Sequence, residues 1–352
     1  MASLLEIGYN ATQSGGREDL SDLISNVDAK STVFTSMAKK GKKPGNAIMG
    51  WQMDKYETPN INGYVDGTDV SMVEGSSGVG QGEAASAKNA LFVNPAKNRV
   101  LAQNYVQIFR RTFRVSSLAN EIQVVAGVKS ELANGIAKKL VELKRDMELT
   151  FLNDGHAQLD AGGTTPYLTK SLGSFLHASG GSAPLAVDSD FYCTAIKSAA
   201  TGSLAEADVQ DNLGQLFTAT GTIRDYDMIL GSTLKRVFTS FTQSATGSND
   251  RLAIKTFNQE ASAKSYINVV DVFEGDFGRL RLHPSNFVAS SGSAVAYRGY
   301  IIPFELAEIR YGKLPQIKEL TDNGGGPARL VEAVAALVIY NPSAFGFYNA
   351  SS

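Results

Sequence analysis

The chain has 352 residues, a length that fits one elaborate domain or two modest ones. It carries 33 Lys and Arg against 35 Asp and Glu, so the formal charge of -2 excludes a global field that would attract nucleic acid or anionic lipid. Hydrophobic residues make up 43% of the chain, which excludes a disordered protein. The single cysteine, Cys193, excludes an internal disulfide. We expect no membrane segment, because no run of roughly 18 apolar residues occurs.

The first 46 residues are predicted to form an N-terminal arm. Apolar residues recur at helical spacing between Arg17 and Val27, which predicts a helix there. A basic run from Lys39 to Lys43 follows, and it leads through Pro44 and Gly45 into a different kind of sequence. A run of lysines is usually a solvated segment, but this one could also contact phosphates in passing.

Residues 47–115 read as an extended loop built on a β-hairpin. Strand-like sequence runs from Ala47 to Thr58 and again from Val100 to Val115. The insert between them, Pro59 to Asn98, is rich in glycine and poor in core-forming residues. Such a length of chain is unusual inside a compact domain, so we expect it to project. Because a two-stranded hairpin is marginal alone in water, it needs a surface to lie on.

The strongest helical pattern runs from Asn120 to Asn153. Its apolar residues step by three or four positions and form one stripe, consisting of Leu132, Ile136, Leu140, Leu143, Met147 and Phe151. A helix of that length would reach roughly 45 to 50 Å. We interpret it as a spine on which other elements lie, within a domain of residues 116–185.

Residues 186–321 alternate between helical and strand-like patterns, so the expected fold class is α+β. Two strands, Ala328–Tyr340 and Ala344–Asn349, are expected to close the chain within residues 322–352 and to return to the domain of residues 116–185. The helices expected in residues 186–321 are Ser189–Ala200, Ala205–Thr218 and Ser232–Phe241, and the strands are Tyr226–Leu230, Asn268–Phe273, Arg279–Leu282 and Val295–Ile302.

The chain shows little that could perform catalysis. Its three histidines, His156, His177 and His283, lie in separate segments without metal-ligand spacing. The glycines from Gly75 to Gly82 resemble a phosphate-binding loop, but Gln81 and Gly82 stand where a Lys and a Ser or Thr are needed. We therefore expect no catalytic residue, no metal and no cofactor. A soluble α+β enzyme remains an alternative, and it would require a cleft of convergent polar groups.

Arginines interrupt the aromatic-rich second strand of the loop at positions 110, 111 and 114. Such a pattern is typical of nucleic-acid surfaces and also of protein interfaces, where Arg, Tyr and Trp are enriched. We favour an interface. The candidate residues for contact between subunits are the aromatic and arginine side chains of the loop: Trp51, Tyr56, Tyr64, Arg99, Tyr105, Phe109 and Arg111.

Several segments, in this order, are similar to one known family. They are Gly16–Ile24, Ile48–Asp54 with its aromatic-Gln-x-Asp pattern, Asp225–Gly231, Asp271–Leu280 and Ala335–Phe347. Together with the order of arm, hairpin, spine helix and α+β domain, they resemble the major capsid proteins of tailed bacteriophages with the Hong Kong 97-type fold. The resemblance implies the names peripheral domain for residues 116–185 and axial domain for residues 186–321.

The resemblance also implies a function without enzymatic activity. Members of the family assemble through pentamers and hexamers into an icosahedral head that encloses the phage genome, with extended loops lying across neighbouring subunits. The chain is then expected in the virion after assembly in the host cytoplasm. Its expected partners are copies of itself, a portal, a decoration protein, packaged DNA held by weak non-specific contact and, since the arm begins by Arg17, a separate scaffolding protein if one is used.

An encapsulin-like nanocompartment shell is the alternative within the same fold, and the size of the loop favours a phage head. If the loop strands form a surface, Trp51→Ala and Tyr105→Ala should impair assembly more than folding.

Overall fold

The computed structural model describes residues 31–56, 59, 61, 66, 71–74, 91–92, 99–121, 130–177, 185–200, 204–241, 270–288 and 298–351. The chain divides into two compact units. The described residues of 31–109, 145–314 and 333–352 form the larger unit, and those of 110–144 and 315–332 form the smaller one. The predicted arm helix from Arg17 to Val27 and the predicted interface residue Tyr64 lie outside the described residues.

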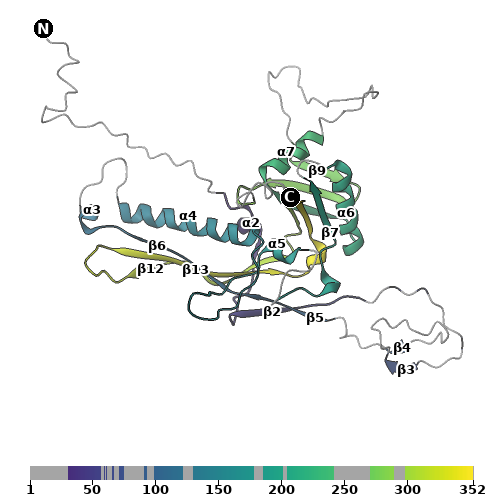
Figure 1. Cartoon of the computed structure of the whole chain (residues 1–352), viewed down its shortest axis with the longest axis horizontal. Helices are drawn as coiled ribbons and strands as arrows, with labels where there is room; N and C mark the ends of the chain where they lie inside the picture. The colour runs from purple at the N-terminus through teal and green to yellow at the C-terminus, as the bar shows by residue number, and fades with distance from the viewer. Residues whose placement is uncertain are drawn as a thin grey trace, which may run out of the picture. The chain divides into compact units, whose positions relative to one another are not determined.

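Helices and strands follow one another along the chain in a mixed order (Figure 1). The helices are α2 (Val33–Met37), α3 (Ser117–Glu121), α4 (Glu131–Leu152), α5 (Leu172–Phe175), η1 (Ser189–Phe191), α6 (Glu206–Thr220), α7 (Ser232–Phe241) and η3 (Pro342–Ala344). The strands are β1 (Lys39–Lys40), β2 (Ile48–Met53), β3 (Ser71–Glu74), β4 (Leu91–Phe92), β5 (Val100–Tyr105), β6 (Gln107–Arg114), β7 (Ala195–Ala200), β8 (Arg224–Leu230), β9 (Val272–Gly275), β10 (Gly278–Pro284), β11 (Gly299–Ile302), β12 (Ala307–Leu320), β13 (Ala328–Ile339) and β14 (Gly346–Ser351). Helices and sheets in this mixture confirm the expected α+β class.

A six-stranded sheet in the order β7-β14-β11-β8-β10-β9 forms the larger of the two main sheets. Strand β8 pairs in parallel with β10 and antiparallel with β11. Alternate side chains of β8 and β10 point to one face, where Tyr226, Met228 and Leu280 join a core with α6 and α7. Figure 1 shows both helices beside this sheet. The residues that the two helices contribute to this core are Val209, Leu213, Leu216, Leu234 and Phe238.

One helix predicted in this region is wrong. Residues 189–200, predicted as a helix, form the short helix η1 and then strand β7. The sequence Ala195–Ala200 contains good helix formers, but β7 pairs in parallel with β14, placing Ile196 opposite Phe347. Tertiary pairing therefore overrides local helix propensity here. The predicted helix Ser232–Phe241 is confirmed with the same bounds.

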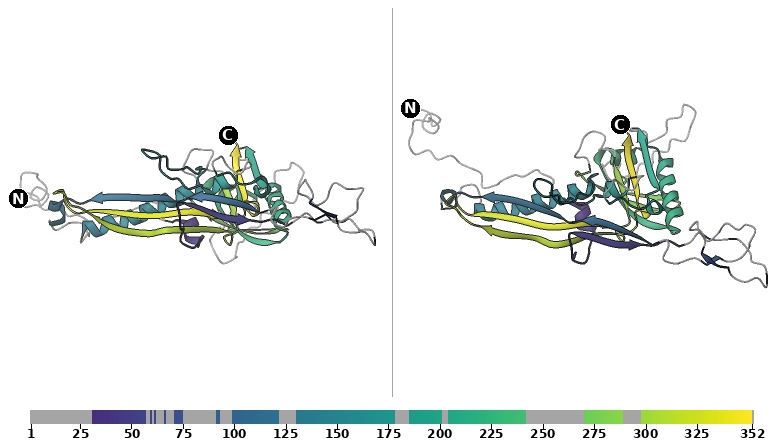
Figure 2. Two further views of the ribbon diagram at one scale, coloured as in Figure 1. Left: turned by 90° about the horizontal axis from the view of Figure 1, so that it is seen from below. Right: turned by 60° about the horizontal axis from the view of Figure 1, so that its bottom comes forward.

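A four-stranded sheet has the order β1-β12-β13-β6, and the long strands β12 and β13 run side by side in both views of Figure 2. Strand β12 was not predicted. Strand β14, predicted to return with the closing strands to residues 116–185, instead joins the six-stranded sheet between β7 and β11. Strand β12, which lies within residues 186–321, is thus hydrogen-bonded in the four-stranded sheet, and β14, which lies within residues 322–352, is hydrogen-bonded in the six-stranded sheet.

The long helix begins later than the sequence predicted. Helix α4 covers 22 residues, from Glu131 to Leu152, and is therefore about 33 Å long rather than 45 to 50 Å. Its predicted stripe is buried at Leu143, Met147 and Phe151. Gly135 has a packing role: a Cβ placed there would lie 2.4 Å from the Phe113 ring.

A buried carboxylate anchors the residues that precede the hairpin. Glu148 of α4 accepts hydrogen bonds from the backbone N–H groups of Phe34 and Thr35, both at 2.8 Å. These are the first amides of α2, which no helical carbonyl can satisfy. Burial raises the pKa of Glu148, and the backbone hydrogen bonds act in the opposite direction. Phe34 packs beside this carboxylate against the ring of Phe151, with 6.2 Å between ring centroids.

Candidate inter-subunit surface

Strands β2 and β5 form a two-stranded antiparallel ribbon at the base of the predicted loop, lying side by side in Figures 1 and 2. Residues directly opposite one another on such strands share a face. Trp51 lies opposite Ala102, and both are buried; Gln52 lies opposite Leu101, and both are exposed. The ribbon therefore has an inner face that packs on the larger unit and an outer face.

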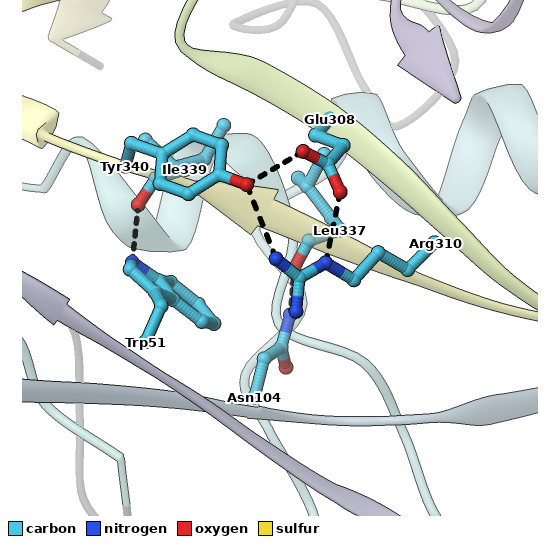
Figure 3. Close-up of polar contacts among 7 residues, drawn as sticks. All are labelled: Trp51, Asn104, Glu308, Arg310, Leu337, Ile339 and Tyr340. Carbon is cyan, nitrogen blue, oxygen red and sulfur yellow. Dashed lines mark hydrogen bonds and ion pairs between the residues drawn. The ribbon is translucent and has the colours of Figure 1, made fainter. Parts of the chain in front are cut away.

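Trp51 fixes the inner face to the body of the larger unit. Its indole Nε1 donates a hydrogen bond to the carbonyl oxygen of Ile339 at 3.0 Å (Figure 3). Its ring centroid lies 6.1 Å from that of Phe175. An indole buried with its one donor satisfied contributes apolar burial without an unpaired polar group. The aromatic residue of the aromatic-Gln-x-Asp pattern thus holds the ribbon in place.

Asn104 fixes the same face through hydrogen bonds made by both polar atoms of its side-chain amide, Nδ2 and Oδ1. Its Nδ2 donates to the carbonyl oxygen of Leu337 at 2.7 Å and to the hydroxyl of Thr169 at 3.0 Å. Its Oδ1 accepts from the backbone N–H of Lys170 at 2.7 Å and from that of Tyr105 at 2.8 Å. One side chain therefore joins three segments of the chain. The sequence analysis missed this residue, although an asparagine between apolar strand residues was a visible signal.

Three side chains beside the ribbon form a closed polar triangle (Figure 3). Arg310 donates to Glu308 at 2.9 Å and to the hydroxyl of Tyr340 at 3.1 Å, and that hydroxyl donates to Glu308 at 2.6 Å. Burial raises the pKa of Tyr340, and the neighbouring Glu308 raises it further. The Glu308 carboxylate also lies over Gly41, where a Cβ would overlap it. The triangle and the pairing of β1 with β12 hold the chain that enters the ribbon.

The outer face of the ribbon exposes apolar and amide groups. Leu101 is 57% exposed and Ile48 is 42% exposed, and Gly50 and Gln52 lie between them along β2. We call Ile48, Gly50, Gln52, Leu101 and Gln103 the ribbon face. Large exposed apolar side chains on a sheet without charged residues are typical of the central part of a protein interface.

Three of the predicted interface residues are buried within the subunit. Trp51, Tyr105 and Phe109 are each about 95% buried: Tyr105 packs against Tyr167 and Phe109 packs against Phe151. This burial opposes the expectation that Trp51→Ala and Tyr105→Ala impair assembly more than folding. Aromatic residues are enriched in cores as well as in interfaces, and the sequence alone did not separate the two.

The other described candidates are exposed. The Tyr56 side chain is 97% exposed, and Arg111 is exposed on β6. Arg99 is half exposed and pairs with Asp54, with 3.4 Å between Nη2 and Oδ2. These three side chains reach the solvent, and Asp54 with Arg99 adds one ion pair at the end of the ribbon.

Groups that could carry chemistry have structural partners. The buried thiol of Cys193 donates to the carbonyl oxygen of Phe345 at 3.0 Å, and burial raises its pKa to about 12. His156 contacts the Ser174 hydroxyl at 3.0 Å. Within the described part of the chain, no cluster of three metal-ligating side chains occurs and no helix is long and apolar enough to span a bilayer.

Comparisons with known proteins find similarity to capsid proteins. The family model of the SU10 major capsid protein matches residues 7–351. No curated protein matches the chain.

Solved phage capsid structures share the fold. The capsid of an empty GTA particle, described with C5 symmetry, has a TM-score of 0.56 at 12% identity and covers 98% of this chain and 99% of its own. The capsid of Myoviridae phage XM1 has a TM-score of 0.55 at 10% identity, with 95% and 97% covered. A chain of Mycobacterium phage Ogopogo has a TM-score of 0.54 at 11% identity, with 95% and 96% covered. These structures confirm the expected Hong Kong 97-type capsid fold.

The match of the family model covers nearly the whole chain. The protein is a structural component of a virion that associates with copies of itself in a capsid shell. The chain belongs to the SU10 major capsid protein family.

Proposed function

We propose that the ribbon face lies on a neighbouring subunit and that this contact builds pentamers and hexamers of an icosahedral head. The observation that carries the proposal is the difference in burial between the two faces of β2 and β5. The inner face is bound through Trp51 and Asn104, while the outer face leaves Leu101 57% exposed. A contact repeated head to tail around a ring closes into a capsomer. The C5 symmetry in the description of the GTA capsid supports a fivefold ring.

The assignment of parts follows the same proposal. Residues 1–46 form the arm, 47–115 the extended loop and 116–185 the peripheral domain with the spine helix. Residues 186–321 form the axial domain around the six-stranded sheet. Strand β14 also belongs to this sheet, although it lies outside that range, and β12 lies inside the range but belongs to the four-stranded sheet. Tyr56, Arg99 and Arg111 are the exposed candidates for further contact with a neighbour.

We propose further partners for assembly of the head and for packaging of DNA. Assembly takes place in the host cytoplasm around a portal, with a separate scaffolding protein and a decoration protein where these are used. Packaged DNA is held only by weak contacts, because a formal charge of -2 gives no strong attraction for phosphates. The exposed lysines Lys39, Lys40, Lys42 and Lys43 supply local positive charge for such contacts.

The experiment is electron microscopy of the purified full chain beside its Leu101→Asp variant. Leu101→Asp places a charge in the ribbon face, so we expect closed particles from the unchanged chain and a loss of at least about tenfold in particles from the variant. Leu159→Asp is the matched control, because Leu159 is 47% exposed and lies outside the ribbon. It should assemble normally.

Thermal unfolding of the three proteins separates assembly from folding, and the midpoints should agree. Normal particles from Leu101→Asp would contradict the role of the ribbon face. Only monomers from the unchanged chain, even with any partner scaffold supplied, would contradict the whole proposal.

A further inference from the structure

The six-stranded sheet has a second face at its β8-β10-β9 end, opposite the core with α6 and α7. Side chains alternate along each strand, so the residues between the core positions Tyr226, Leu280 and Leu282 point away from that core. The acidic and basic residues among them are Asp225 and Asp227 on β8, Glu274 on β9, and Arg279, Arg281 and His283 on β10; Ile229 of β8 also lies on this face and is buried. We call the six acidic and basic residues the striped face, because on this face β8 and β9 carry carboxylates and β10 carries two arginines and a histidine.

The stripes are acidic on β8, basic on β10 and acidic on β9. Ion pairs join them: Arg281 Nη2 lies 3.1 Å from Asp225 Oδ2, and Arg279 Nη2 lies 2.5 Å from Glu274 Oε1. His283 Nε2 lies 2.8 Å from Asp227 Oδ1. The two arginine pairs are about half exposed on both sides. The charges of the two arginine pairs are therefore satisfied inside the subunit and are still accessible from outside, whereas the Asp227 side chain is only 19% exposed.

Exposed ion pairs contribute little to the stability of a single subunit, about 0 to 1 kcal/mol each. Three neighbouring stripes of fixed sign can also match the stripes of a second molecule, which isolated ion pairs cannot do. Neighbouring strands lie about 4.8 Å apart, so when a second striped face is shifted by one strand, one acidic stripe of each copy lies over the basic stripe of the other. Such a surface is complementary to itself, and like charges oppose any pairing in the unshifted register.

We propose that the striped face is a docking surface for a second copy of this chain, in which complementary stripes set the register between neighbouring subunits. The inference rests on the proposed self-association and adds to it a second surface, chemically unlike the uncharged ribbon face. The balance of charge favours a copy of the chain over nucleic acid, because the acidic residues Asp225, Asp227 and Glu274 would repel phosphates. Val272, 47% exposed opposite Arg281 on the same face, adds an apolar contact at its edge.

A swap of one ion pair tests the proposal without removing the pair. The double variant Asp225→Arg with Arg281→Asp keeps an ion pair inside the subunit but reverses the order of charge that a neighbour meets. We expect its thermal unfolding midpoint to match that of the unchanged chain and its yield of closed particles to fall at least about tenfold. A solvated surface would tolerate the swap, so normal particle yield from the double variant would overturn the proposal.

The matched control is a swap of an ion pair elsewhere, Lys139→Glu with Glu142→Lys on α4, whose Nζ and Oε2 atoms lie 2.6 Å apart. It should assemble normally. If the first swap disturbs folding, the neutral variant Asp225→Asn with Arg281→Gln replaces it. We expect fewer particles from this variant and a weaker dependence of assembly on salt, because interface charges are screened by ions. Unchanged yield together with unchanged salt dependence would overturn the proposal.

Failure of this inference differs from failure of the proposed function. The ribbon face is tested by Leu101→Asp, and the striped face by the charge swap. Loss of particles in the first variant with normal particles in the second would retain the ribbon contact and remove the striped face alone.

Discussion

The inner and outer faces of the ribbon are made by the same twelve residues of β2 and β5, yet they have opposite chemistry. The inner face buries an indole and an amide whose polar atoms are all bound. The outer face exposes Leu101 and Ile48 with no charged residue between them. Burial and exposure thus alternate along β2 and from Leu101 to Asn104 on β5, as the period of a strand requires, whereas Tyr105, opposite Ile48, is buried against Tyr167. Variants on the two faces should therefore separate folding from assembly.

The largest effect on stability is expected at Trp51. Trp51→Ala removes a buried ring and leaves the Ile339 carbonyl without its indole donor, so the free energy of unfolding should fall by about 3 to 5 kcal/mol. Chemical denaturation of the assembly-deficient Leu101→Asp background would measure this on subunits. A loss below about 1 kcal/mol would mean that the inner face does not hold the ribbon.

A pH dependence is expected at Lys170, whose backbone N–H binds Asn104. Burial lowers the pKa of the Lys170 amine from 10.5 to about 8. Between these values the unfolded chain binds more protons than the folded chain, so the free energy of unfolding should rise with pH, by up to about 3 kcal/mol. Lys170→Met should flatten the dependence in denaturation measured from pH 8 to 10.5. An equal slope in both proteins would contradict a buried amine as its source.

A smaller loss is expected at Asn104. Asn104→Leu keeps the branched shape of the side chain but leaves the Lys170 N–H and the Leu337 carbonyl without their amide partner, which should cost about 2 to 3 kcal/mol. The control is Gln103→Leu, one residue along β5 on the ribbon face, which should change stability by less than about 0.5 kcal/mol. Similar losses in both variants, measured by urea unfolding, would remove the distinction between the two faces.

Much of the fold follows from periodicity in the sequence. Helix α7 and the buried stripe of α4 were predicted because their apolar residues repeat at about 3.6 positions, and strand β8 was predicted as a buried strand from its apolar run. Strand β12 was missed because Lys313, Pro315 and Lys318 interrupt its pattern, and a proline lowers the expectation of a strand. Hydrogen bonding to β13 stabilises this strand, although its local sequence does not favour one.

The candidate surface was predicted less completely than the fold. The sequence located the loop strands, but it could not tell which aromatic residues face inward, because that depends on the register of β2 against β5. Among the predicted interface residues, Tyr56 and Arg99 are exposed, whereas Trp51, Tyr105 and Phe109 are buried. The striped face was invisible in the sequence, since β8 and β10 lie about fifty residues apart and meet only through parallel pairing.

The bonds from Glu148 to α2 have a mechanical consequence for the arm. A force that pulls residues before Val33 away from the subunit acts first on the two hydrogen bonds that Phe34 and Thr35 donate to Glu148. It reaches the Lys39–Lys40 pairing with β12 only after those bonds break, because the two attachments are arranged in series along the chain. Strain on the arm is thus borne by the rigid helix α4 before it reaches the ribbon, so movement of the arm can leave the register of the ribbon face unchanged.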